Sequence, residues 1–303
     1  MRLSDSDFQQ LLDVRVHQPA SIAEAYASRP RRTEIAPDGA LFIIAADHTA
    51  RGALAVGQNP LAMADRRDLI ERLATALENP RVDGVLASAD IMDDLMVLGL
   101  LDGRVAIGTM NRGGLMGAKW EIDDRMTAFD VEHIVRSGLD AGKVLLRIDD
   151  DDAGTTSTLE SCGQTVTNLA DHQRLVMIEP IAYTKNDAGL AIQDARPEKV
   201  IRAAAVASGL GSTSAYTWLK IRADVAAWES MSVTTCPSLL LGGALSDDPG
   251  ATYASWEKSL THPNCRGLVV GRSMLYPHDG DVAAAVDVTA RLVATQSIGR
   301  RSS

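Results

Sequence analysis

The chain has 303 residues, of which 46% are hydrophobic, 23% are charged and only 4% are aromatic. These values are typical of a globular protein with an aliphatic core, built as one large α/β domain or two small ones. The formal net charge of −10 argues against nucleic acid and against an anionic membrane surface as partners, because both would repel the chain.

The cysteines and the N-terminal residues indicate where the protein works. Cys162, Cys236 and Cys265 are odd in number and lack the spacing of a metal site, so we interpret them as reduced thiols of a cytoplasmic protein. The first residues, MRLSDSDFQQLL, are charged and amphipathic, and no run of 18 apolar residues occurs. We therefore expect neither a secretion signal nor a membrane span.

Residues 1–40 are predicted to form an N-terminal helical extension. Ser4 or Asp5 can cap a first helix, and a second helical piece follows Ser21 and ends at Pro30. We expect this extension to be a lid or a subunit contact rather than a separate domain.

From Leu41 onward, eight short apolar segments alternate with helical ones. The apolar segments are 41–46, 82–87, 104–108, 143–148, 175–180, 214–221, 236–241 and 266–270, and helices are expected at about 60–77, 92–100, 124–139, up to 169, 197–207, 253–260 and 281–294. Continuously apolar strands are typical of parallel sheets that are buried on both faces. Eight such units predict an α/β fold, a (β/α)8 TIM barrel over residues 41–298. An open doubly wound sheet is the alternative, but neither GxGxxG nor GxxxxGK occurs.

The segment 214–221 carries a lysine, Lys220, near its end. Burial lowers the pKa of a lysine, and the neutral amine is a nucleophile that forms Schiff bases with carbonyl compounds. The alternative is a lysine that reaches solvent at the rim or pairs with a carboxylate.

Charged residues of the fourth and fifth segments are further candidates. Glu179 closes the fifth segment and could donate or accept a proton once burial raises its pKa, with Tyr183 as a second candidate, or it could simply pair with a lysine. Lys143 and Arg147 point the same way on the fourth strand, and a second cation there would repel the ammonium form of the nucleophile. The acidic run 149–152 is more typical of a solvated loop than of a metal site.

The first, seventh and eighth segments end in residues that suit an anionic substrate. Asp47 could orient a hydroxyl or relay a proton, or it could cap a turn. His48 has no second histidine at ligand spacing, so no metal is expected. Glycine N–H groups and a guanidinium after the last two strands would bind phosphate; they belong to Gly242, Gly243, Gly271 and Arg272.

Three stretches carry a family resemblance: Lys220 after its apolar strand, PSLLLGG at 237–243 and GLVVGR at 267–272. They resemble the class I (Schiff-base) aldolases of the fructose-bisphosphate, tagatose-bisphosphate and deoxyribose-phosphate aldolase superfamily, which are (β/α)8 barrels. The chain is also similar to an aldolase encoded with actinobacterial inositol-breakdown enzymes. The resemblance covers most of the chain from Leu41 onward and is densest from Tyr216 to Met274.

The resemblance implies a role for each candidate. Lys220 would be the Schiff-base lysine, Glu179 would be the acid, and Lys143 would match a fourth-strand lysine of the tagatose type. Asp47 would help to hold the substrate, and the glycines with Arg272 would form a phosphate cradle. Two departures stand out: the deoxyribose-phosphate enzymes have a second lysine where this chain reads SLLL at 238–241, and Tyr183 comes late for the tyrosine of the archaeal type.

The sequence thus predicts a metal-independent class I aldolase without a cofactor, acting on a phosphorylated keto sugar or sugar acid. Examples are 2-deoxy-5-keto-gluconate 6-phosphate and a ketose bisphosphate. His48, Arg147 and Asp47 would contact the substrate, and a homo-oligomer is expected. The alternatives are a sugar-phosphate isomerase or epimerase that uses Glu179 and Asp47 as acid and base, and a non-catalytic sugar-phosphate-binding protein.

Overall fold

A computed structural model describes residues 3–223, 226–243 and 248–301. Within them, eight parallel strands form a closed ring in the order β1-β2-β3-β4-β5-β7-β8-β9, and β9 pairs with β1. The strands are β1 (Leu41–Ala45), β2 (Gly84–Ala87), β3 (Val105–Thr109), β4 (Ala141–Ile148), β5 (Leu175–Lys185), β7 (Thr217–Arg222), β8 (Ser238–Leu241) and β9 (Cys265–Val270). The pairing of β4 with β5 closes the ring. The predicted TIM barrel is therefore confirmed, and the open sheet is excluded.

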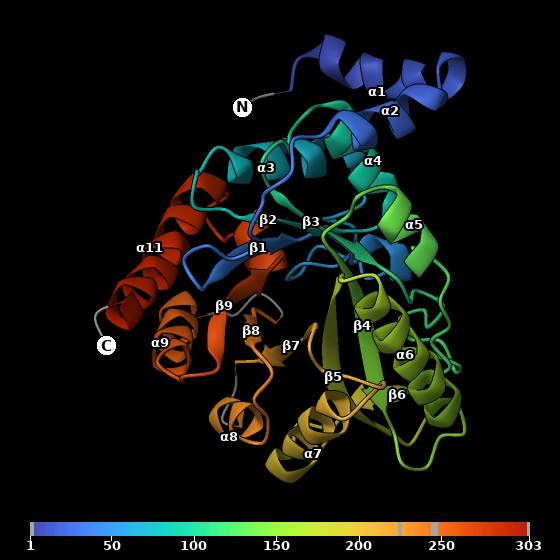
Figure 1. Ribbon diagram of the computed structural model, residues 1–303, viewed down its shortest axis with the longest axis vertical. Helices are drawn as coiled ribbons and strands as arrows, with labels where there is room; N and C mark the ends of the chain where they lie inside the picture. The colour runs from blue at the N-terminus through green and yellow to red at the C-terminus, as the bar shows by residue number, and fades with distance from the viewer. Residues whose placement is uncertain (1–2, 224–225, 244–247, 302–303) are drawn as a thin grey trace.

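Helices surround the ring of strands on its outside (Figure 1). They are α3 (Arg66–Leu77), α4 (Ala89–Val97), α5 (Val131–Arg136), α6 (Gly154–Asp171), α7 (Pro197–Ser208), α8 (Ala227–Ser232), α9 (Pro249–Leu260), α10 (Arg272–Leu275) and α11 (Val282–Arg301), with a 3-10 turn, η1 (Thr49–Arg51), after β1. None of the helices in the described ranges combines the length and the apolar character that a membrane crossing requires.

The helix predicted at 124–139 is much shorter than expected. Only α5 is helical there, and it begins after Asp130, whose carboxylate accepts a hydrogen bond from the N–H of His133 (2.6 Å). Residues 110–130 form an irregular loop instead. Its polar groups are bound by buried side chains of the barrel, which the apolar pattern alone does not indicate.

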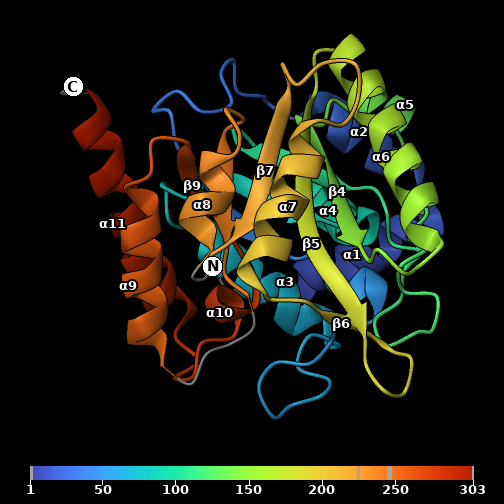
Figure 2. The ribbon, with the colours of Figure 1, turned by 90° about the horizontal axis from the view of Figure 1, so that it is seen from below.

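Strand β5 is longer than predicted. It continues to Lys185, well past position 180, because its end forms an antiparallel hairpin with β6 (Ala191–Gln193). Figure 2 shows β5 as the long yellow strand that ends beside β6. The polar turn NDAG at 186–189, between β-prone residues, is a hairpin signal of the usual kind.

The interior of the barrel changes from apolar to charged along its axis. Its inner cluster is aliphatic and includes Leu41, Ile43, Leu86, Ile107, Met177, Leu239 and Val269. Residues between them on the strands, such as Phe42 and Leu240, face outward and join a larger core under the helices. Towards the C-terminal ends of the strands, the buried inward positions hold Lys143, Glu179 and Lys220.

The N-terminal extension packs outside two helices and then crosses the other end of the barrel. Its helices are α1 (Asp5–His17), which Ser4 caps and which pairs with α3 and α4, and α2 (Ala20–Ser28), which lies against α4 (Figure 1). The chain then crosses the N-terminal ends of β2 and β3, where Arg32 pairs with Asp83 (2.7 Å) and Ile35 packs against the inner cluster. Residues 29–36 therefore close the bottom of the barrel, and the extension is not a lid over the C-terminal ends of the strands.

Arg29 should be the strongest single link between this extension and the barrel. Its buried guanidinium pairs with Asp140 (3.3 Å) and donates to the carbonyls of Arg104 and Gly138 (2.6 and 2.8 Å). We expect Arg29→Met to lower the free energy of unfolding by about 3 kcal/mol, because a buried carboxylate loses its buried partner. Arg31→Met is the matched control: its side chain binds the same Asp140 but is 40% exposed, so a loss of under about 1 kcal/mol is expected. Equal losses in urea unfolding would contradict this assignment.

Candidate active site

A cavity of about 610 Å³ opens at the C-terminal ends of the strands, where barrel enzymes place their reactive groups. Ten of the residues predicted from the sequence line it: Asp47, His48, Lys143, Glu179, Tyr183, Lys220, Gly242, Gly243, Gly271 and Arg272. Arg147 does not line it. The structure thus brings together residues from six strands that lie up to 225 positions apart (47 to 272) in the sequence.

Two buried lysines share one carboxylate at the floor of the cavity. Lys143 Nζ lies 2.6 Å from Glu179 Oε2, and Lys220 Nζ lies 3.2 Å from the same oxygen. Lys143 also lies 3.2 Å from Asp47 Oδ2. Lys143 and Lys220 reach this point from β4 and β7, which flank β5 on either side.

Burial lowers the pKa of both amines. For Lys220, desolvation opposes the attraction of Glu179 and is reinforced by the Arg112 and Arg51 guanidinium groups. The pKa of Lys143 falls well below its ordinary value because of burial and the nearby charge of Arg112. Two ammonium groups this close to one carboxylate repel each other, so the pair readily loses one proton.

The pKa of Glu179 moves in the direction opposite to that expected from the sequence. Burial alone would raise it, but the two lysines and Arg112 outweigh burial and hold the pKa well below its usual range. Glu179 is therefore ionised and accepts hydrogen bonds from both amines. In the unliganded site it is suited to accept a proton rather than to donate one.

Arg112 is a site residue that the sequence analysis did not select. It follows β3, is buried, lines the cavity and forms an ion pair with Asp47. Its Nε donates to Thr109 Oγ1 (2.9 Å), and its backbone N–H donates to Thr127 Oγ1 (3.1 Å). The sequence signal was present as a donor-rich, glycine-rich loop after the third strand, but nothing in that pattern distinguishes a binding residue from a mobile loop.

Glycines at the ends of β8 and β9 line the cavity beside Arg272. A Cβ on Gly271 would lie 2.4 Å from the carbonyl oxygen of Ala45, so this position excludes any side chain. Arg272 and Arg51 face the same side of the cavity, and the buried Arg272 Nε has no hydrogen-bond partner among the described residues. A guanidinium with an unpaired Nε beside these glycines suits an anionic group such as phosphate.

His48 stands beside this cradle as a neutral imidazole. Burial lowers its pKa well below the ordinary value, and the charges of Arg272, Lys220 and Arg51 lower it further. Its buried Nδ1 has no hydrogen-bond partner among the residues described. A neutral ring can still donate or accept one hydrogen bond to a substrate oxygen.

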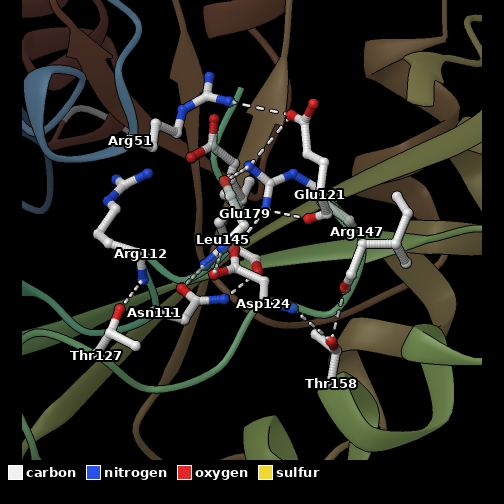
Figure 3. A network of polar contacts seen from close by, with 12 residues as sticks. Arg51, Asn111, Arg112, Glu121, Asp124, Thr127, Leu145, Arg147, Thr158 and Glu179 are labelled. Atoms are coloured by element: carbon white, nitrogen blue, oxygen red, sulfur yellow. Dashed lines mark hydrogen bonds and ion pairs between the residues drawn. The ribbon is translucent and has the colours of Figure 1, made fainter. Parts of the chain in front are cut away.

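Arg147 supports the loop that forms one wall of the cavity, the segment 110–126. Its guanidinium is fully buried, pairs with Asp124 (2.5 Å) and Glu121 (3.5 Å), and donates to the carbonyl of Gly114 (3.2 Å). Glu121 also lies 3.6 Å from Arg51, and Figure 3 shows Glu121 between the two arginines. Arg147 therefore affects the cavity through this loop and does not itself line the cavity.

The adjoining wall, at the end of β5, is largely apolar. Tyr183 is 7% exposed and packs with Ile122, Leu145 and Ile181, and residues of the β5–β6 hairpin, Leu190 and Ile192 among them, continue this surface. Above its charged floor, the cavity thus has cations after β1 and β9 and an apolar surface at the end of β5 and on β6.

Two residues of the acidic run 149–152 form ion pairs with lysines and an arginine. Asp150 binds Lys199 (2.7 Å) and Arg202 (2.6 Å), and Asp152 binds Lys185 (2.8 Å). Among the described residues, no group of three or more His, Cys, Asp or Glu side chains could hold a metal ion.

Comparisons with known proteins agree with this fold. A family model described as Cgl0159-like matches residues 39–290. The crystal structure of Cgl0159 from Corynebacterium glutamicum is 49% identical in sequence, with a TM-score of 0.93 over 97% of this chain and 98% of that chain. An archaeal fructose 1,6-bisphosphate aldolase is 17% identical with a TM-score of 0.66, over 90% of this chain and 99% of that chain.

A second archaeal fructose-1,6-bisphosphate aldolase, whose catalytic lysine is covalently bound to the carbinolamine intermediate of its substrate, is 18% identical with a TM-score of 0.65, over 90% of this chain and 99% of that chain. At this level of identity, the likeness to the aldolases concerns the fold. Among curated proteins, none matches the chain.

Proposed function

We propose that this chain, which belongs to the Cgl0159-like family, is a class I aldolase that makes or breaks a carbon–carbon bond through a Schiff base on Lys220. The observation that carries the proposal is a buried amine of lowered pKa that faces a cavity, with an ionised carboxylate 3.2 Å away. The aldolase-like barrel is consistent with this reading.

The chemistry follows from the positions of these groups. The neutral amine of Lys220 attacks the ketone carbon of the substrate to give a carbinolamine, and loss of water gives an iminium ion. The iminium takes up the electron pair of the C3–C4 bond while a base removes the proton of the C4 hydroxyl group. The remaining enamine is protonated and hydrolysed, which releases the second product and the free amine.

Two groups compete for the role of the base. Glu179 is ionised and adjacent to Lys220, so it can accept the hydroxyl proton directly. Tyr183 lies two inward-facing positions further along β5, at the apolar wall of the cavity. Because Glu179 lies 3.2 Å from the Lys220 amine, whereas Tyr183 lies at the apolar wall, Glu179 is the better supported base.

We expect the substrate to be a phosphorylated keto sugar or sugar acid. The phosphate would bind in the cradle of Gly242, Gly243, Gly271 and Arg272, and Asp47 would accept a hydrogen bond from a hydroxyl group. A local cationic cradle is needed because the chain as a whole has a net charge of −10. Both 2-deoxy-5-keto-gluconate 6-phosphate, as in the actinobacterial inositol-associated aldolase, and a ketose bisphosphate fit this description. Catalysis by a homo-oligomer in the cytoplasm remains part of the proposal.

The isomerase alternative receives less support from the contacts. It requires Asp47 to act as an acid or a base, yet Arg112 and Lys143 both hold this carboxylate. The isomerase reaction also gives the buried Lys220 no role. A non-catalytic binding protein would need only the phosphate cradle. Such a protein would bind a sugar phosphate without converting it, which distinguishes it from an aldolase.

Reductive trapping tests the proposed function. We expect borohydride to attach dihydroxyacetone phosphate irreversibly to Lys220, and mass spectrometry of the digested protein will identify the modified peptide. An adduct on Lys143 would assign the nucleophile to the other buried amine. Failure to trap dihydroxyacetone phosphate or any of a panel of ketose phosphates would contradict the aldolase proposal.

A further inference from the structure

Five charged side chains form a continuous row across the floor of the cavity. Arg112 pairs with Asp47, and the Oδ2 atom of that carboxylate also contacts Lys143 (3.2 Å). Lys143 in turn contacts Glu179 Oε2 (2.6 Å), and this same oxygen contacts Lys220 (3.2 Å). Each carboxylate thus places one oxygen between two basic groups. All five residues are at least nine-tenths buried.

The row holds three basic groups and two acidic ones, so full ionisation leaves one uncompensated positive charge. A buried charge without a partner is costly, and the least costly response is the release of one proton. Arg112 keeps its proton at neutral pH, because burial lowers its pKa only to about 10. One of the two lysines must therefore be the neutral group.

The contacts select Lys220 over Lys143. Lys143 touches both carboxylates and lies closer to Glu179 than Lys220 does. Among the described residues, Lys220 contacts a single carboxylate oxygen of the row, and that oxygen is already bound to Lys143. Removing the proton from Lys220 therefore gives up one contact of the row, whereas removing it from Lys143 gives up two. Because burial lowers the pKa of both amines, the contacts decide between them.

We propose that Arg112 is a positioning residue: by occupying Asp47 it leaves Glu179 as the principal partner of Lys143, and so it keeps Lys220 in the neutral, nucleophilic form. This inference rests on the proposed function and assigns to it a residue that does not touch the reacting amine. Arg112 and Lys220 stand at opposite ends of the row. Arg112 thus controls the protonation of the nucleophile through the three residues between them, Asp47, Lys143 and Glu179.

The other charged or titratable groups around Lys220 are the same with or without Arg112. They are His48 and Arg51 after β1, Arg272 on α10, Glu121 in the 110–126 loop, Tyr183 on β5 and Arg222 on β7 itself. Without Arg112 the row has two basic and two acidic groups. Asp47 then becomes available to Lys143, Glu179 becomes available to Lys220, and both amines can stay protonated.

Loss of Arg112 is expected to slow trapping at low pH. Trapping requires the neutral amine, so its rate falls as the pH drops below the pKa of Lys220. Loss of Arg112 raises that pKa, and the acidic limb of the profile moves to higher pH. For Arg112→Gln we expect a shift of at least one pH unit, which corresponds to about a tenfold lower rate at a fixed pH on the limb. Arg112→Lys restores a cation beside Asp47 and should return the limb towards that of the unaltered protein.

The experiment measures the rate of borohydride trapping of dihydroxyacetone phosphate against pH for the full-length protein and both variants. If Arg112→Gln does not fold, Thr109→Val serves instead, since it removes the oxygen that accepts from Arg112 Nε (2.9 Å) and leaves every charge in place; a smaller shift in the same direction is expected. A uniform loss of rate without a shift of the limb, or a shift that Arg112→Lys does not reverse, would overturn the inference. Absence of trapping in the unaltered protein would instead overturn the proposed function.

Discussion

Replacing Lys220 by methionine is expected to reduce aldol cleavage by roughly 10⁴-fold or more, the scale seen when a covalent nucleophile is removed. Methionine preserves most of the length of the side chain, so the cavity keeps its shape. Glu179 keeps its closer partner, Lys143, at 2.6 Å. Because no carboxylate is left unpaired, we expect the melting temperature of Lys220→Met to stay the same or to rise.

Lys143→Met is the informative comparison for this variant. It removes the amine that both Asp47 and Glu179 contact, but Arg112 stays beside Asp47 and Lys220 stays beside Glu179. Activity should therefore fall, while the loss of stability stays below about 3 kcal/mol. Lys258→Met, on α9 far from the cavity, controls for loss of a lysine. Steady-state cleavage and thermal unfolding of the three variants give the comparison. If Lys220→Met retains more than a tenth of the activity, Lys220 is not the nucleophile.

Arg147→Met is expected to lower the free energy of unfolding by about 3–5 kcal/mol, because it leaves the buried Asp124 without its cation and takes from Glu121 one of its two cations. The guanidinium is fully buried and also binds the Gly114 carbonyl, so the 110–126 loop loses its attachment to β4. Since Arg112 and Glu121 lie on this loop, activity should fall together with stability. Chemical denaturation followed by tryptophan fluorescence measures the effect.

Arg125→Met is the matched control within the same loop. Its guanidinium pairs with Asp123 (2.9 Å) but is 75% exposed, and exposed pairs contribute under about 1 kcal/mol. If both variants unfold at the same denaturant concentration, Arg147 does not support the loop. If Arg147→Met folds stably but fails to bind a phosphorylated ketone, the original expectation that Arg147 holds substrate would regain support.

The fold was predictable because parallel strands that are buried on both faces appear in the sequence as continuous apolar runs. Lys220, Lys143 and Glu179 could be selected by the same logic, since a charged residue inside such a run needs a buried partner or a cavity beside it. Their mutual contacts could not be predicted, because alternation along a strand gives the direction of a side chain but not which partner it meets. The pKa of Glu179 was expected in the wrong direction for this reason: burial is visible in a sequence, whereas two lysines around one oxygen are not.

The walls of the cavity were the least predictable part. Residues 110–130 are held by single long-range contacts, such as those of Arg147 and Asn111 with segments more than 20 positions away. No periodic pattern records such contacts, so the segment was partly taken for a helix. The turn residues at 186–189 indicate the hairpin that extends β5. The predicted barrel needs only eight strands, so the prediction does not include β6.

The reactive row and the β5–β6 hairpin occupy different parts of the chain. The row sits on or directly after β1, β3, β4, β5 and β7, whereas residues 186–193 of the hairpin lie outside the ring of eight strands. The covalent step and this wall are therefore physically separable in this molecule, whereas the 110–126 loop carries Arg112 and belongs to both. Exchange of the hairpin between family members should retune which aldehyde or acid is accepted, while the covalent step stays intact.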